Sequence, residues 1–296
     1  MREITLQEVL DAREARAAAQ RRLMDKYSHP LLFLTMNSAG PLKRWGTVDL
    51  VFRAAETELD RRLAGHIREK SLTDAATGLE GIWACDIPAP ELKELAIELE
   101  TRNSVGRLYD LDVIGTDGIK LSRPTPRTCL VCGGPATPCA RSRAHGLDAI
   151  LAATHALLND FAADYLAETA VQALIDEVEL TPKPGLVDRN NSGAHRDMDL
   201  MTFADSAYAL TPYFVSCARE GLEFAEEREE LPNLFERLRI LGREGEKAMK
   251  KAAKGTNPHK GIIFSGGILC CCAGYIAGRP ENDFRNEDFP RILGEI

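Results

Sequence analysis

The chain has 296 residues, of which 44% are hydrophobic and 28% are charged, a composition typical of a folded protein with a large buried core. Its formal charge of −8 arises after residue 155, because residues 1–155 carry 21 basic and 21 acidic side chains whereas residues 156–296 carry 16 and 24. This balance argues against a general nucleic-acid binder, which needs a basic face to neutralise phosphates. This charge asymmetry suggests two units of different evolutionary origin.

The first part of the chain is predicted to be an α/β or α+β unit. Its charged, amphipathic start does not have the form of a signal peptide, and its clearest strand alternates polar and apolar residues before a Thr-Asp-Gly turn. In chain order we expect a helix over about the first 30 residues, a strand at Leu31–Met36, a helix over 48–64, a strand at 81–87, a helix over 88–102 and a strand over 106–118. Strands separated by helices predict a mixed architecture.

From Leu147 onward the pattern is helical, and we place a domain boundary near residue 155, which gives domains 1–155 and 156–296. Gly261–Gly278 has eighteen residues without a charge, but five of them are glycines, so we expect a tightly packed buried helix rather than a membrane span. Eight cysteines in a chain without a visible export signal predict reduced thiols and a cytoplasmic protein.

Asp110 and Asp112 lie two residues apart in the predicted strand, so both carboxylates face the same side. Such a pair can share one divalent ion or bridge two beside a phosphate, and the alternative is a strand edge with two solvated acids. The form Asp–apolar–Asp–apolar resembles the metal-binding strand of nucleotidyltransferases. Gly106 and Arg107 add flexible backbone and a basic group just before it.

Cys129, Cys132, Cys139 and His145 have the spacing C-x2-C-x6-C-x5-H. A C-x2-C pair is half of a typical zinc site, and a third cysteine with a histidine completes four ligands. Only one such pair is present, so uncoordinated thiols packed as small apolar residues and a redox role stay open. The consecutive Cys270–Cys272 cannot all point one way on a helix, which predicts core packing there.

Two polar turns in the second part of the chain are candidate ligand loops. In Thr181–Asp199 the candidate phosphate donors are Arg189, Asn190, Asn191 and Arg196, and the candidate acids for a metal or a ribose hydroxyl are Asp188, Asp197 and Asp199. The alternative for this stretch is a polar loop that precedes a helix. Asp197 and Asp199 would then flank the start of that helix, where acids stabilise the positive end of its dipole. In 254–261, Asn257, His259 and Lys260 precede an apolar helix, whose first amides would make a phosphate seat with the lysine.

Both parts resemble known families. "TPKPGLVDRNNSGAHRDMD", "TFADSAYALTPYF" and "GTNPHKGIIFSGGILC" resemble the triphosphoribosyl-dephospho-CoA synthase family. "DAREARAAAQRRL", "PLLFLTMNSAGPLK", "GRLYDLDVIGTDG" and "CLVCGGPATPCARSRAHGLDAIL" resemble the phosphoribosyl-dephospho-CoA transferase, or holo-acyl-carrier-protein synthase, of citrate lyase. The resemblance implies a nucleotidyltransferase-like domain followed by an all-helical domain that lacks the second half of its family.

The resemblance also implies two transferase reactions. The synthase joins ATP to 3′-dephospho-CoA with release of adenine, and the transferase attaches the product to a serine of the apo acyl-carrier subunit with release of pyrophosphate. We expect Asp110 and Asp112 to hold Mg²⁺, and Arg107 and Lys43 to hold the triphosphate. For the synthase the candidates are Lys183, Arg189, Arg196 and Lys260 for the triphosphate, Asn190, Asn257 and His259 for further substrate contacts, Asp197 or Asp199 for metal, and His195 or Asp188 for the base.

Two alternatives remain open from the sequence. In one, the helical part is a non-catalytic docking or dimerisation module and a single activity is retained. In the other, the protein is a zinc-binding adaptor built on residues 129–145.

Overall fold

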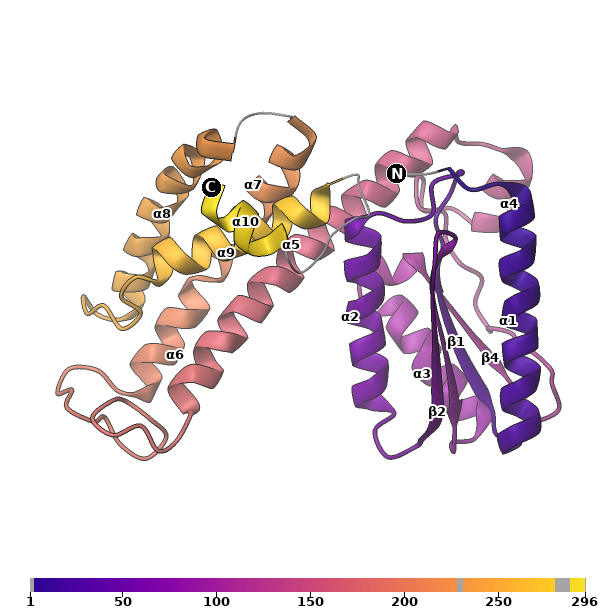
Figure 1. Ribbon diagram of the computed structural model, residues 1–296, viewed down its shortest axis with the longest axis horizontal. Coiled ribbons are helices and arrows are strands. Elements are labelled where there is room, and N and C mark those ends of the chain that lie inside the picture. Colours follow the sequence, from indigo (N-terminus) through magenta and orange to yellow (C-terminus); the bar gives the residue numbers. More distant parts are fainter. Residues whose placement is uncertain (1–2, 228–230, 280–287, 296) are drawn as a thin grey trace. The chain divides into compact units, whose positions relative to one another are not determined.

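A four-stranded antiparallel sheet lies at the centre of the first of two units into which the chain folds, Met1–Leu158 and Asn159–Ile296. The computed structural model describes residues 3–227, 231–279 and 288–295. Figure 1 shows the first unit as a sheet covered by helices and the second as helices alone. The predicted order, a mixed α and β region followed by a mostly helical region, is therefore confirmed.

The strands of the first unit have the order β2-β3-β1-β4. Helix α1 lies on one face of the sheet, and α2 and α3 lie on the other (Figure 1). The elements are α1 (Leu6–Tyr27), β1 (Leu31–Met36), α2 (Gly46–Arg62), β2 (Ile67–Ala75), β3 (Gly78–Cys85), α3 (Ala89–Thr101), the short 3-10 helix η1 (Val105–Leu108), β4 (Tyr109–Ile114) and α4 (Ala136–Ser142). The inner strand β1 is covered on both faces, which explains the apolar run Leu31–Leu34.

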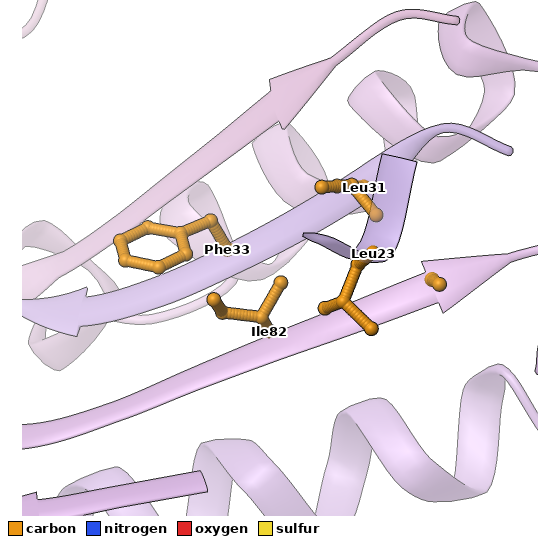
Figure 2. Packing of buried hydrophobic residues seen from close by; sticks show 5 residues of the cluster. Leu23, Leu31, Phe33 and Ile82 are labelled. Carbon is orange, nitrogen blue, oxygen red and sulfur yellow. The ribbon is translucent and has the colours of Figure 1, made fainter. Parts of the chain in front are cut away.

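The α1 face of the sheet holds a compact apolar cluster. Leu23 of α1 packs against Leu31 and Phe33 of β1 and against Ile82 and Ala84 of β3, and all five residues are buried. Figure 2 shows the side chains of Leu23, Leu31, Phe33 and Ile82 gathered beside the strands. This cluster fixes α1 over the sheet, and the part of α1 before the cluster is therefore held over the strand ends where polar residues begin.

The strand predictions were right for β1, and the predicted strand at 81–87 overlaps β3. Strand β2 was missed because most of its residues are polar and it lies at an edge of the sheet, so it has no apolar alternation. The predicted strand over 106–118 was too long, since β4 begins only at Tyr109. A Cβ at Gly106 would lie 2.6 Å from the carbonyl oxygen of Leu99, so this glycine lets η1 pack against the last turn of α3.

The second unit consists of helices. They are α6 (Leu200–Ala209), α7 (Thr211–Glu227), α8 (Leu231–Ala252), α9 (Ile262–Gly278) and α10 (Asp288–Glu295), preceded by the long α5 (Leu147–Glu179), which runs across the division between the units. Within the described parts of the chain, no helix is long and apolar enough to cross a membrane.

Helices α7 and α9 pack with their backbones in close contact. A Cβ at Gly221 would lie 2.0 Å from the carbonyl oxygen of Cys271, and one at Gly274 would lie 2.1 Å from that of Ala218. Cys270–Cys272 are all buried, as their predicted core packing requires. The glycines of α9 thus serve close helix packing, in agreement with the predicted buried helix.

We predict that Gly274→Ala destabilises the second unit, because the added methyl group overlaps a backbone carbonyl that no side-chain rotation can move. The expected loss is roughly 1–3 kcal/mol of unfolding free energy, measured by thermal or urea unfolding. The control is Gly294→Ala, since nothing lies within 4 Å of a Cβ at this position of α10. Equal unfolding of the two variants would contradict the close approach of α7 and α9.

Candidate active site

A cavity of about 220 Å³ lies between the first half of α1 and the sheet. Its polar lining residues are Arg13, Arg16, Thr35, Asn37, Ser38, Lys43, Thr77, Glu80 and Asp110. Thr35 pairs with Asp110 across the β1–β4 ladder, and Phe33 pairs with Asp112. Because side chains alternate along a strand, both aspartates point to the face that carries Phe33 and α1.

Lys43 and Asp110, which the sequence placed in one site, border the same cavity. The Lys43 ammonium donates a hydrogen bond to the carbonyl oxygen of Ser38, and burial lowers its pKa. Arg13 and Arg16 of α1 were missed by sequence reasoning. Arg16 pairs with the carboxylate of Glu80 and lies over the Phe33 ring, 4.8 Å from its centroid. The spacing of three residues between the two arginines was the available signal, because it places both on one helix face.

The two aspartates of β4 each contact a cation. An Asp110 oxygen lies 3.3 Å from Nη2 of Arg127, and an Asp112 oxygen lies 2.5 Å from Nζ of Lys120. The side chains are 47% and 23% exposed, respectively, so solvent reaches both. Mg²⁺ in proteins usually keeps several waters and takes one or two carboxylates, often beside substrate phosphates. The two carboxylates on one face fit that requirement.

Arg107 lines a second cavity of about 570 Å³, which also has Arg123, Arg127 and Glu100 in its lining. Burial lowers the pKa of Arg107, and the neighbouring Arg127 and Arg123 lower it further. The Glu100 side chain is only 2% exposed and pairs with both Arg123 and Arg127. Because Arg127 also contacts Asp110, this arginine connects the two cavities. Sequence reasoning missed Arg123 and Arg127, whose only local signal is the run "SRPTPR".

The cysteine segment folds so that its four predicted ligands meet. One ligand atom from each of Cys129, Cys132, Cys139 and His145 lies within 4.8 Å of the others. Backbone N–H groups of Cys132 and Val131 donate to the Cys129 sulfur and lower its pKa to about 6. A thiolate stabilised in this way is the form that binds metals.

In the second unit, the loop between α5 and α6 is organised around Asp188. This buried carboxylate accepts hydrogen bonds from the backbone N–H groups of Lys183, Asn190 and Asn191, at 3.0, 2.8 and 3.0 Å. These donors, Lys183 first, hold its pKa below its ordinary value. A carboxylate bound in this way is a weak base, so the geometry favours a role in loop structure over the predicted role as catalytic base.

Two of the predicted phosphate donors are occupied by ion pairs at the end of α5. The Lys183 ammonium lies 2.7 Å from an oxygen of Glu177, and Arg189 pairs with Glu179. Asn190 is exposed and contributes its backbone N–H to Asp188. These contacts tie the loop to α5.

The end of the same loop borders a cavity of about 360 Å³, together with the end of α8. Its charged lining residues are Arg196, Asp197, Asp199, Asp205 and Lys254. Asp199 caps α6 through Thr202, and the Thr202 hydroxyl lowers its pKa. Neither Arg196 nor Lys254 forms an ion pair with any residue that the structure describes. His195 donates its backbone N–H to Ser192 and does not border this cavity.

The turn at 254–261 borders a different cavity, of about 400 Å³, which Asn257 and His259 line. His259 is buried, and its Nε2 lies 3.1 Å from the carbonyl oxygen of Phe203, which anchors the turn to α6. Burial lowers the pKa of His259. Lys260 is exposed and is not part of this lining. Arg243 of α8, which sequence reasoning missed, borders the cavity.

Comparison with known families explains the division into two units. Residues 4–161 match the family model described as apo-citrate lyase phosphoribosyl-dephospho-CoA transferase. The chain belongs to this family. Residues 163–292 match a second family model, described as ATP:dephospho-CoA triphosphoribosyl transferase. Both resemblances expected from the sequence motifs are thus confirmed.

Curated relatives join the same two parts in one chain. The chain is 40% identical to "Protein CitXG" of Haemophilus influenzae over 280 residues, which covers 92% of this chain and 60% of the relative. It is 33% identical to "Protein CitXG" of Leuconostoc mesenteroides subsp. cremoris, with 92% of this chain and 62% of the relative covered. It is also 41% identical over 155 residues to the 2-(5''-triphosphoribosyl)-3'-dephosphocoenzyme-A synthase of Haemophilus ducreyi, covering 51% of this chain and 47% of that relative. The chain therefore spans about 60% of the length of the two-part relatives.

We predict that Asp188→Asn destabilises the second unit at neutral pH and that this difference shrinks in acid. The carboxylate's depressed pKa contributes stability above about pH 3.9, the ordinary pKa of aspartate, and the contribution is lost as the pH falls through the lower pKa of the folded state. Thermal unfolding of both proteins across this range measures the difference. Asp164→Asn, an exposed acid of α5, is the control. A wild-type advantage that stays constant down to the lowest pH would contradict the assignment.

Proposed function

We propose that the first unit transfers the phosphoribosyl-dephospho-CoA group to a serine of the apo acyl-carrier subunit of citrate lyase and releases pyrophosphate. The observation that carries this proposal is the cavity in which Lys43 and Asp110 meet, within a unit that belongs to the transferase family. A sheet with an Asp-x-Asp strand is typical of nucleotidyltransferases, and we assign the unit to that fold.

In the proposed reaction, the serine hydroxyl oxygen attacks the α-phosphorus of the triphosphoribosyl group. The bond from this phosphorus to the pyrophosphate oxygen breaks, pyrophosphate leaves, and the hydroxyl proton passes to solvent. Lys43, Arg13 and Arg16 supply positive charge to the cavity and thereby bind the triphosphate. Arg107 and Arg123, in the neighbouring cavity, would hold a more distant phosphate of the substrate.

Asp110 and Asp112 would hold Mg²⁺, which when bound neutralises phosphate oxygens during phosphoryl transfer. Arg127 contacts the carboxylate of Asp110, and Lys120 contacts that of Asp112. These contacts relieve the repulsion between two like charges on one strand face.

For the second unit we propose a part in forming the triphosphoribosyl precursor from ATP and 3′-dephospho-CoA. The ribose 2′-hydroxyl of dephospho-CoA attacks C1′ of ATP, the bond from C1′ to adenine breaks, and the proton of the hydroxyl leaves with adenine. Arg196 and Lys254 bind the triphosphate in this proposal, since both border one cavity without an ion-pair partner in the described chain. Asp197 and Asp205 are the acids there for a metal or a ribose hydroxyl.

We predict that Asp110→Asn lowers transfer at least ~100-fold, since the neutral amide removes a metal-binding charge worth several kcal/mol in the transition state. Purified precursor and apo acyl-carrier subunit are incubated with the protein and Mg²⁺, and the mass increase of the carrier is followed. Asp25→Asn is the control, because Asp25 is an exposed residue of α1 outside the cavity. Normal transfer by Asp110→Asn, or none by the wild type, would contradict the proposed function of the first unit.

We predict that Arg196→Gln combined with Lys254→Gln lowers adenine release at least ~10-fold, since two charge-assisted contacts to the triphosphate are lost. Adenine formed from ATP and dephospho-CoA is measured by chromatography. The control, Lys247→Gln, removes an exposed cation of α8 that pairs with Glu244. If the wild type releases no adenine, the second unit is not a synthase in this chain, and a docking module becomes the better description.

A further inference from the structure

The four residues Cys129, Cys132, Cys139 and His145 have the dimensions of a tetrahedral metal site. Their ligand atoms all lie within 4.8 Å of one another, and the sulfurs of Cys132 and Cys139 are 3.6 Å apart. Sulfurs bound to one tetrahedral zinc ion at about 2.3 Å lie roughly 3.8 Å from each other. A disulfide would instead bring two sulfurs to about 2.05 Å. The observed separation is close to that of shared coordination.

The backbone conformation around the first two cysteines also fits a shared metal ion. The Cys129 N–H donates to the carbonyl oxygen of Gly134 at 2.6 Å, and the Gly133 N–H donates to that of Cys129 at 3.1 Å. Gly133 has a φ of +71°, which a glycine adopts without strain. This tight turn points the sulfurs of Cys129 and Cys132 to one side.

The other two ligands come from α4 and the turn that ends it. Cys139 lies within α4, and the Ala144 N–H donates to its carbonyl oxygen at 3.0 Å, which returns the chain toward the cysteines. Nε2 of His145 is buried and has no hydrogen-bond partner among the residues that the structure describes. A buried imidazole nitrogen costs free energy unless something binds it, so its position beside three thiols independently indicates a ligand for a metal ion.

We propose that these four residues hold a structural Zn²⁺ ion. Three thiolates and one imidazole are a common donor set for zinc, and a site with four protein ligands is closed to substrate. The remaining cysteines, Cys85, Cys217 and Cys270–Cys272, are all buried.

The zinc site also positions Arg127, and this second step rests on the proposed transferase function. Thr128 bridges to Pro135, and the Ala136 N–H at the start of α4 donates to the carbonyl oxygen of Arg127 at 2.9 Å. The backbone of Arg127 is therefore bound to the same loop that the metal ion closes. Its side chain contacts Asp110 and Glu100, so loss of zinc loosens the arginine that connects the two cavities.

Metal analysis of the intact protein tests the proposal. After expression with zinc and dialysis against metal-free buffer, we expect about one zinc ion per chain, and Cys132→Ser and His145→Ala each lose most of it. Cys270→Ala, which removes a buried thiol from α9, should keep the full amount. Co²⁺ exchanged into the wild type should give thiolate-to-cobalt charge-transfer bands and the visible bands of tetrahedral Co²⁺, which tests the site without any substitution.

Two results would overturn the zinc site. One is wild-type protein that holds no zinc and gives no tetrahedral Co²⁺ spectrum. The other is a Cys132–Cys139 disulfide found by mass spectrometry in freshly purified, alkylated protein. Zinc content does not depend on activity, so bound zinc without transfer to the carrier would contradict the proposed transferase function alone. If the wild type binds zinc and the zinc-free Cys132→Ser variant transfers at the wild-type rate, only the positioning of Arg127 is overturned.

Discussion

The buried carboxylate of Glu100 determines how the candidate active site is arranged. One of its oxygens accepts the backbone N–H of Leu111 in β4 at 3.0 Å, and the same carboxylate pairs with Arg123 and Arg127. A buried charge is costly unless several donors bind it, so strand, helix and arginines must stay together. Lys93 of α3 completes this attachment, since its ammonium donates to the carbonyl oxygen of Leu111 at 3.2 Å. The outer edge of β4 is thereby covered by α3 side chains.

This attachment connects features that look separate in the sequence. Because β4 is held against α3, Asp110 stays at the edge of the first cavity. Because Glu100 also holds Arg127, this arginine contacts Asp110 from the side of the second cavity. Arg127 in turn begins the cysteine loop, whose backbone is bonded to the start of α4. A single carboxylate on α3 thus orders the paired aspartates, the arginine cavity and the position of the loop that gathers the cysteines.

The sequence predicted the local parts of this arrangement, and the rest depends on long-range pairing. Alternation in β4 was enough to place Asp110 and Asp112 on one face, and the cysteine spacing was enough to group the four candidate ligands. Arg13 and Arg16 could not be assigned, because their place opposite Asp110 follows from packing α1 on the sheet through Leu23. Polar edge strand β2 gave no apolar alternation and was missed for the same reason, since its partner β3 defines it.

In the second unit, the ion pairs of the structure distinguish predicted phosphate donors that are bound to acids from those that are not, which the sequence could not do. The polar loop offers cations and acids in nearly equal number, but Lys183 and Arg189 are paired with acids at the end of α5, and Asp188 is taken up by backbone N–H groups. A unit with a net negative charge attracts a triphosphate only where local cations are left unpaired. Of the described cations that border its cavities, Arg196, Lys254 and Arg243 are those without an ion pair. Arg196 and Lys254 share one cavity beside the start of α6, where Asp197, Asp199 and Asp205 also lie, while Arg243 borders another cavity, so Arg196 and Lys254 are the pair of cations that the proposal assigns to the triphosphate.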